Sequence, residues 1–324
     1  MPRVLIIGTG IAGLFAALRL ANEGFEVEII TKQRPKDSST NWAQGGIAAI
    51  LDKTNLQEIE GHIKDTLDAG DGLCDERVVR MVVEEAGERI MDLLSIGVEF
   101  ERNKQGEFQL AQEGGHSSRR ILHAKDATGK EIERALTTAA QEHQHITMRP
   151  NTLAIDLIQR QHKHPSKGVC GVWALDQSTN QVMTIEGDAV ILATGGAGQL
   201  WEKTTNPSVS TGDGIAMAYR TGASIINMAF VQFHPTALVV EGERPFLITE
   251  ALRGEGAVLL DESGYDDWKR SGESEPGAFS FTLEASPLGS MATRDVVARS
   301  IDQRCAESGA SHVYLVTEHL DKAH

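Results

Sequence analysis

The chain has 324 residues, of which 40% are hydrophobic and 24% charged, as is typical of a soluble globular protein with one large domain or two ordinary ones. Its formal net charge of −15 argues against a nucleic-acid partner, because such a surface repels polyanions and the sequence has no basic stripe. No apolar stretch approaches the length of a transmembrane helix, so we expect no membrane association.

The first thirty residues predict a β-α-β unit. Residues 4–7 form a short apolar run, which is typical of a parallel strand covered on both faces. After a glycine-rich turn, the spacing of Leu14, Leu18 and Ala21 predicts a helix that ends near Gly24. Residues 27–31 are the second expected strand. Because the first apolar run stops after four residues, it predicts a strand and not a signal peptide.

The middle of the chain continues to alternate between the two patterns. Residues 37–46 are polar and predict a loop, and residues 100–110 predict a hairpin. We expect helices at 59–69, 76–96, 129–143 and 215–219, and strands at 146–148, 152–158, 169–175, 181–185 and 189–193, the last of them buried.

The sequence pattern changes near residue 230, where short strands, glycines and charged loops replace the alternation of strands and helices. Residues 262–290 are rich in Ser, Gly, Asp and Glu and predict a long surface excursion. A helix at 295–307 and a strand at 313–317 follow. The patterns together predict an α/β fold whose last third is α+β.

Isolated residues support less specific expectations. Cys74, Cys170 and Cys305 form no CxxC pair, so we expect no zinc or iron–sulfur site, and their sparse number fits a reducing cytoplasm. We expect the histidines on polar stretches to be solvated: His62, His143, His145, His162 and His164. We expect Trp173 and Trp201 to pack, and the sequence assigns no individual roles to Arg119, Arg120 and His123.

The turn between the first strand and the first helix has the pattern Gly8-x-Gly10-x-x-Gly13. Gly8 allows a tight turn, Gly10 lets the backbone approach a pyrophosphate, and Gly13 lets helix and strand pack closely. The pattern alone is weak, and the alternative is a glycine-rich turn with no ligand. Its place between a clear strand and a clear helix favours dinucleotide binding.

Two further residues are candidates for the same cofactor. Lys32 follows the second strand, where the generic fingerprint has Asp or Glu; it is either a contact to a phosphate or ribose or a solvated lysine. Asp213 opens a helix, where a cap is the alternative to a cofactor contact.

The last third concentrates costly polar groups in three segments: Gln232-Phe233-His234-Pro235-Thr236-Ala237-Leu238, Thr249-Glu250-Ala251-Leu252-Arg253-Gly254-Glu255-Gly256 and Arg294-Asp295. Few core segments need so many polar groups. A pocket for a small dicarboxylate does need them, because arginine forks and His or Thr donors hold carboxylates best.

These motifs resemble the flavoprotein family that contains L-aspartate oxidase, fumarate reductase and succinate dehydrogenase, from Val4 to about Leu320. The resemblance implies a GR2-type, Rossmann-like FAD-binding domain at 1–227, interrupted by an α+β capping domain at 228–324. It implies cofactor contacts at Gly8, Thr9, Gly10, Ile11, Ala12, Gly13, Lys32, Ser39, Thr40, Asn41, Trp42, Ala43, Gln44, Gly45, Gly46 and Asp213. Ser39 stands where many relatives carry a flavin-linking histidine, so the implied FAD is non-covalent.

The resemblance also assigns substrate residues. His234 and Thr249 bind a substrate carboxylate, with Gln232 and Glu250 beside them. Arg294 matches the family's proton-transferring arginine; because the ordinary pKa of arginine is too high for a base, a carboxylate clamp is the alternative role. The family generally has Pro before this arginine, where this chain has Thr293.

Glu113, in the string Glu-Gly-Gly-His-Ser, stands where fumarate reductases and succinate dehydrogenases have an uncharged residue. A carboxylate there would complement the ammonium group that distinguishes aspartate from succinate. An exposed loop glutamate is the alternative.

Glu113, Ser39 and Ala237 favour the aspartate oxidase branch. The implied reaction oxidises L-aspartate to iminoaspartate, with electrons passing to oxygen or fumarate, and feeds NAD synthesis through quinolinate synthase. The alternatives are a soluble fumarate reductase or succinate dehydrogenase flavoprotein and an inactive FAD-binding fragment. Because family members continue past His324, we expect a C-terminally truncated chain that binds FAD weakly and turns over little.

Overall fold

The computed structural model describes residues 1–125, 127–238, 240, 242–243 and 245–320, which divide into two compact units. The first unit comprises Met1–Gln44, Leu93–Glu99 and Ala127–Phe230, and the second comprises Gly45–Asp92, Phe100–Asp126 and Val231–His324. The expected division into domains at 1–227 and 228–324 stays a prediction, and its last residues, 321–324, lie outside the described part of the chain.

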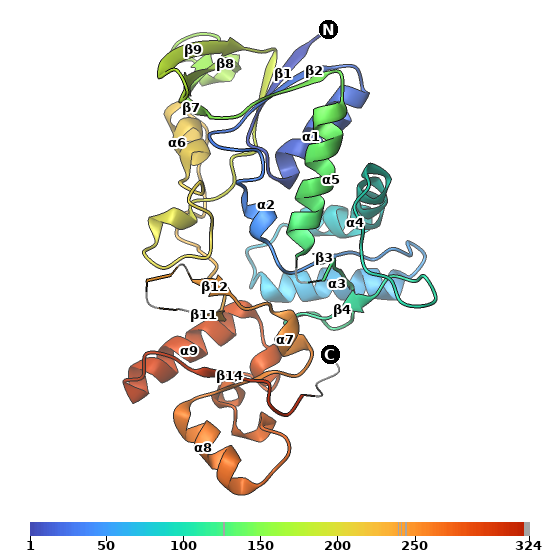
Figure 1. The fold of residues 1–324 in the computed structure, drawn as a ribbon, viewed down its shortest axis with the longest axis vertical. Helices are drawn as coiled ribbons and strands as arrows, with labels where there is room; N and C mark the ends of the chain where they lie inside the picture. The colour runs from blue at the N-terminus through green and yellow to red at the C-terminus, as the bar shows by residue number, and fades with distance from the viewer. Residues whose placement is uncertain (126, 239, 241, 244, 321–324) are drawn as a thin grey trace. The chain divides into compact units, whose positions relative to one another are not determined.

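The first unit holds two sheets and the helices around them. Its elements are β1 (Arg3–Ile7), α1 (Ile11–Asn22), β2 (Glu26–Ile30), α2 (Ser39–Trp42), α5 (Thr128–Glu142), β6 (Ile146–Arg149), β7 (Thr152–Gln159), η1 (Pro165–Lys167), β8 (Val169–Asp176), β9 (Gln181–Glu186), β10 (Ala189–Leu192), η2 (Gly198–Leu200) and α6 (Asp213–Arg220). Figure 1 shows α5 beside α1, and the two helices are in contact.

The main sheet is parallel, with strand order β10-β1-β2-β6. After β1 the chain moves through α1 to β2 on one side, whereas β10 pairs with β1 on the other side. The strand order therefore reverses beside β1. In open α/β sheets, such a switch point at the carboxyl ends of the strands is where ligands bind.

Burial follows the position of each strand in this sheet. Leu5, Ile6 and Ile29 in the two inner strands are fully buried. The strand expected at 189–193 is present as β10, but its expected burial is wrong: β10 lies at the sheet edge and Leu192 is 37% exposed. The antiparallel sheet β7-β8-β9 packs against β1 and β2 in one apolar core that also includes Met217 of α6.

The second unit contains short sheets and most of the remaining helices. Its elements are β3 (Ile47–Ala48), α3 (Leu56–Ala69), α4 (Glu76–Ile96, whose last four residues group with the first unit), β4 (Leu110–Ala111), β5 (Ile121–Leu122), β11 (Ala237–Leu238), β12 (Phe246–Leu247), α7 (Ala251–Gly254), β13 (Val258–Leu260), α8 (Glu262–Ser271), η3 (Gly277–Phe279), η4 (Phe281–Glu284), η5 (Gly289–Met291), α9 (Arg294–Ser308) and β14 (Tyr314–Val316). Around the expected hairpin at 100–110, Arg102 and Phe108 form a single antiparallel bridge.

The surface excursion predicted for residues 262–290 is wrong. This stretch folds into α8 and three short 3₁₀ helices, and it buries Trp268 and Phe281. Its serines satisfy the backbone of β13: Ser280 Oγ donates to the Leu259 carbonyl (2.7 Å), and Ser290 Oγ accepts from the Leu259 amide (3.0 Å). The buried Ser280 and Ser290 of this stretch therefore serve backbone pairing in a core and are not exposed to solvent.

Three smaller expectations are also wrong. The loop expected at 37–46 contains the short helix α2. His62 is buried, because it shares the inward face of α3 with Ile59 and Ile63. Trp173 and Trp201 are not buried: they are 50% and 45% exposed. Among the described residues, no helix is both long and apolar enough to cross a membrane.

Candidate functional site

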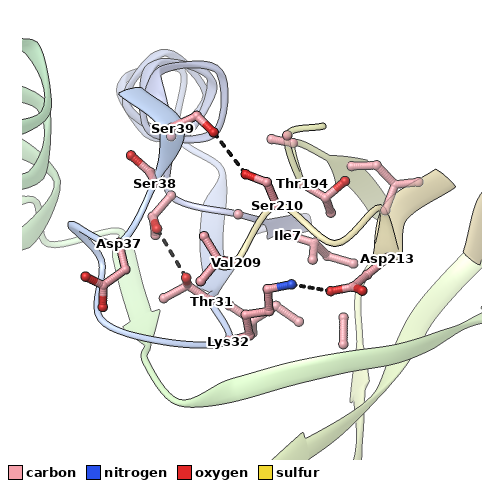
Figure 2. A pocket seen from close by; sticks show the side chains of 18 of the residues that line it. Ile7, Thr31, Lys32, Asp37, Ser38, Ser39, Thr194, Val209, Ser210 and Asp213 are labelled. Atoms are coloured by element: carbon pink, nitrogen blue, oxygen red, sulfur yellow. Dashed lines mark hydrogen bonds and ion pairs between the residues drawn. The ribbon is translucent and has the colours of Figure 1, made fainter. Parts of the chain in front are cut away.

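A cavity of about 420 Å³ opens at the carboxyl ends of β1, β2 and β10, where the strand order reverses. Its volume lies in the range of small-molecule sites. It is lined by the β1–α1 turn, by the ends of β2 and β10, by the start of β7, and by the segments around Ser39 and Ser210 (Figure 2).

Two glycines, one in the turn after β1 and one in the first turn of α1, leave no room for a side chain. Gly8 has φ +114°, and a Cβ there would lie 2.2 Å from the Ala193 carbonyl oxygen. A Cβ at Gly13 would lie 2.1 Å from the Gly8 carbonyl oxygen. Gly8 therefore allows the turn to pass beside the chain that follows β10, and Gly13 lets α1 pack onto β1.

We expect a Gly8→Ala substitution to destabilise the first unit by roughly 2–5 kcal/mol, because it combines a strained φ with a steric clash. Gly24→Ala is the matched control: Gly24 also has positive φ (+84°), but a Cβ there meets nothing within 4 Å. The control should cost only about 1 kcal/mol. Urea unfolding measures both, and equal losses would show that the close approach to Ala193 does not matter.

Hydroxyl groups tie the rim of the cavity together. Thr40 Oγ1 accepts a hydrogen bond from the Ile11 amide in the first turn of α1 (3.0 Å). Ser39 Oγ lies 3.1 Å from Ser210 Oγ, so these two side chains join the segments that carry them (Figure 2). Thr9 Oγ1 lies 2.9 Å from the Pro35 carbonyl, to which it can donate.

Lys32 and Asp213 form an ion pair on the wall of the cavity (Figure 2). Both also hydrogen-bond to Thr211 Oγ1. Burial opposes ionisation of Asp213, but the hydrogen bonds from Lys32 and Thr211 outweigh it and lower its pKa. Asp213 is the first residue of α6 but makes no side-chain capping bond, because Gly212 is the N-cap. Lys32 is therefore paired rather than fully solvated, and the assignment of both residues as cofactor contacts stays a prediction.

The predicted cofactor residues divide into two groups. Those that line the cavity are Gly8, Thr9, Gly10, Ile11, Ala12, Lys32, Ser39, Thr40 and Asp213. Those that do not line it are Gly13, Asn41, Trp42, Ala43, Gln44, Gly45 and Gly46. Trp42 is 54% exposed, and its expected flavin-shielding role stays a prediction. Gln44 Oε1 is buried without a hydrogen-bond partner in the described residues.

Several lining residues were not predicted as sites. They are Ile7, Ile30, Thr31, Asp37, Thr152, Leu153, Ala154, Leu192, Val209, Ser210 and Met217. Ser38 and residues 193–195 also line the cavity, and they belong to two segments that resemble cofactor-contacting segments of the family. The turn after β10 carries a recognisable Thr-Gly-Gly signal. The start of β7 and the segment at 209–210 have no local signal, because only the topology brings them to the sheet edge.

The lining fits a dinucleotide. α1 begins at the cavity with no acidic residue in its first turn, so its positive end can face a phosphate. Lys32 adds a cation, and Ser39, Thr40 and Ser210 add hydroxyls. The backbone of the β1–α1 turn carries no side chain at Gly8 and Gly10 that would block the approach of a pyrophosphate.

A second cluster, within the second unit, surrounds Arg294 at the start of α9. Arg294 Nε donates to Glu250 Oε2 (2.7 Å), and Arg294 Nη1 donates to Gln232 Oε1 (3.1 Å). The other oxygen of Glu250 accepts from Arg253 Nη2 (2.7 Å). Glu250 is 3% exposed and Arg253 1% exposed, so this Arg–Glu–Arg chain is a buried network that fixes one edge of the Arg294 guanidinium.

Glu113 belongs to the same cluster and is not an exposed loop glutamate. Its side chain is 13% exposed, and Oε2 lies 3.8 Å from Arg294 Nη2. Its other oxygen accepts a long hydrogen bond from the Gly46 amide (3.5 Å). Burial, and then the negative charge of Glu250, raise the pKa of Glu113.

The remaining predicted substrate residues lie nearby in the chain but differ in environment. His234 is half-buried, and its Nδ1 lies 3.2 Å from the Thr236 amide. Burial, and then the charge of Arg294, lower the pKa of His234 to about 4, so its imidazole is neutral at pH 7. Thr249 Oγ1 accepts a weak bond from the Ala251 amide (3.4 Å), and Gln232 is exposed.

Arg120, to which the sequence assigned no role, is one of the most buried side chains in the second unit. It is 1% exposed and donates to Asp65 Oδ2 (2.7 Å). Asp65 also accepts from the amide and the hydroxyl of Ser117 (both 2.8 Å). The pair therefore holds the end of the Glu-Gly-Gly-His-Ser string that carries Glu113. Beside it, burial and then Arg120 lower the pKa of His62 to about 4.

This cluster can hold a small anion that also carries a positive group. The guanidinium of Arg294, one third exposed, and the neutral His234 offer hydrogen-bond donors for a carboxylate. Glu113 offers a desolvated acceptor close to Arg294. The assignment of these residues to substrate binding stays a prediction.

Comparisons with known proteins identify the family. The FAD binding domain family matches residues 3–324. The chain is similar to chloroplastic L-aspartate oxidase 2-a of Nicotiana tabacum, with 44% identity over 323 residues that cover 97% of this chain and 47% of that protein. L-aspartate oxidase of Yersinia pestis is 42% identical over 322 residues, which cover 98% of this chain and 57% of that protein.

Among solved structures, the FrdA chain of Escherichia coli quinol fumarate reductase superposes with a TM-score of 0.84 at 28% identity, over 99% of this chain and 54% of that one. The chain thus has the α/β fold of that flavoprotein and spans about half the length of the relatives it matches. Because the family match covers nearly the whole sequence, the protein belongs to the FAD binding domain family, and its cofactor is FAD.

Proposed function

We propose that this protein oxidises L-aspartate to iminoaspartate. The observation that carries the proposal is the pairing of Arg294 with a desolvated Glu113, whose Oε2 lies 3.8 Å from Arg294 Nη2. L-aspartate carries two carboxylates and one ammonium group, so it needs both signs of charge in its site. Succinate and fumarate have no ammonium group and would bring only negative charge toward Glu113, which disfavours their binding. The similarity to L-aspartate oxidases supports the same substrate.

FAD, when bound, supplies the acceptor for a hydride from the substrate Cα. Before that step the substrate ammonium must lose a proton, because its nitrogen needs a lone pair to form the C=N bond. Glu113 is the proposed acceptor, since burial raises the pKa of its carboxyl group and so strengthens its hold on a proton. Arg294, His234 and Thr249 would bind the carboxylates, and Glu250 would orient Arg294 through its Nε.

The wider setting of the reaction belongs to the same proposal. Ser39 cannot form the histidyl link to flavin, so we propose non-covalent FAD. We propose oxygen or fumarate as electron acceptors, a cytoplasmic location, and use of the product by quinolinate synthase on the route to NAD. The names of the plant relatives place those proteins in chloroplasts.

A fumarate reductase or succinate dehydrogenase flavoprotein is the second candidate, favoured by the TM-score of 0.84 with the fumarate reductase chain. Ammonium release from L-aspartate, compared with dye-coupled oxidation of succinate, separates the two. We expect ammonium release without succinate oxidation, and the reverse result would favour the second candidate. Because the chain spans about half of its relatives, yellow protein with neither activity would indicate FAD binding without turnover.

A further inference from the structure

One buried acidic side chain of the first unit has no role in the proposed chemistry. Glu133 of α5 is 2% exposed. Its Oε2 accepts a hydrogen bond from Ser38 Oγ (2.9 Å), and its Oε1 accepts a longer one from Thr137 Oγ1 (3.4 Å). Burying a carboxyl group this deeply costs free energy unless its oxygens are hydrogen-bonded.

Ser38 connects Glu133 to the cofactor cavity, which Ser38 lines (Figure 2). The Ser38 hydroxyl donates its single proton to Glu133. The same oxygen accepts from the Asn41 amide (3.3 Å), and Ser38 is thus the N-cap of α2. Glu133 therefore sets the direction of the Ser38 hydroxyl and keeps its lone pair turned toward Asn41.

The turn that Ser38 caps presents Ser39 and Thr40 to the cavity, where they bond to Ser210 and to the Ile11 amide. α5 packs closely against the backbone of this turn: a Cβ at Gly129 would lie 1.8 Å from the Thr40 carbonyl oxygen. Glu133 lies one helical turn beyond Gly129 and holds a side chain of the same segment. A change in Ser38 would thus displace hydroxyls on two sides of the cavity.

We propose that Glu133 is a positioning residue for FAD, because it fixes the Ser38 hydroxyl and thereby the turn that lines the cofactor cavity. The inference rests on FAD as the cofactor and not on which substrate is oxidised. It needs no contact between Glu133 and FAD. Burial raises the pKa of Glu133 to about 7, so below that pH the carboxyl group adds no negative charge near a pyrophosphate.

The test is a titration of the full chain with FAD, followed by the quenching of flavin fluorescence. Glu133→Leu removes the acceptor and should raise the Kd about tenfold or more. Glu133→Gln keeps an acceptor oxygen and should stay within about threefold of wild type. Ser38→Ala should resemble Glu133→Leu, and the double variant should bind no more weakly than either single variant. Glu142→Gln, on the exposed end of α5, is the control and should leave the Kd unchanged.

Additive losses in the double variant, or a Glu133→Gln variant as weak as Glu133→Leu, would overturn the inference. An unchanged Kd for Ser38→Ala would do so even if Glu133→Leu failed to fold. If the wild-type chain, which spans about half of its relatives, binds no measurable FAD, amide hydrogen exchange of the flavin-free chain decides on Glu133. Protection of the Asn41 amide, which donates to Ser38 Oγ, should be kept in Glu133→Gln and reduced in Glu133→Leu; equal protection in these two variants would contradict the proposal.

Discussion

A Glu250→Ala substitution is expected to destabilise the second unit by about 3–5 kcal/mol. The carboxylate is 3% exposed and is shared by two guanidiniums, Arg253 Nη2 and Arg294 Nε, each at 2.7 Å. Among the described residues, alanine would leave the buried Arg253 with only the Ser290 carbonyl as an acceptor (2.6 Å). Urea unfolding followed by tryptophan fluorescence, to which the buried Trp268 contributes, measures the loss.

Two variants control this prediction. Glu250→Gln keeps the volume and one acceptor oxygen but removes the charge, so its cost should be intermediate. Glu255→Ala removes an exposed carboxylate that pairs with Arg119 at 3.3 Å, and it should cost under about 1 kcal/mol. A Glu250→Ala variant as stable as Glu255→Ala would show that the buried ion network does not hold this part of the unit together.

A Glu113→Gln substitution is expected to weaken binding of L-aspartate about 30-fold or more at pH 8, which corresponds to about 2 kcal/mol. The reason is loss of the only negative group proposed to face the substrate ammonium. Binding of succinate should stay unchanged or improve, because the variant no longer repels it. Calorimetric titration of the FAD-loaded chain with both diacids measures the two affinities.

The affinity for L-aspartate should depend on pH differently in the wild type and in the Glu113→Gln variant. The pKa of Glu113 is raised above its ordinary 4.5, so the carboxylate that L-aspartate needs is complete only above that raised value. Affinity of the wild type for L-aspartate should therefore fall as the pH drops through it, and the Gln variant should lack this step. Glu107→Gln, in an exposed turn, is the control; a step that persists in Glu113→Gln would assign the titration to another group.

The opening of the fold could be predicted from the sequence because local and long-range requirements agree there. Apolar strands, a 3.6-residue period in α1 and the glycines at 8 and 13 all indicate a β-α-β unit. The structure contains this unit as β1, α1 and β2. Residues 262–290 have the composition of a surface loop, but Ser280 and Ser290 satisfy the backbone of β13, which lies more than twenty residues away from Ser280 in sequence. Composition reports polarity, but it does not report which polar group is paired.

The candidate sites show the same limit. Lys32 and Asp213 were separate candidates, and their ion pair across 181 positions of sequence follows only from the parallel sheet. Arg253 was visible as a charged residue in its motif, but its burial against Glu250 was not. The polar neighbours of His62 in sequence predict a surface residue, whereas its position on the inward face of α3 buries it beside Arg120.

The most direct test of the central claim is a single-turnover measurement on the FAD-loaded chain without oxygen, which does not require efficient turnover. L-aspartate is mixed with the yellow protein, and the flavin absorbance near its visible maximum is followed over time. The account predicts that L-aspartate bleaches the flavin and that succinate at the same concentration does not. Bleaching by succinate, with no response to L-aspartate, would contradict it.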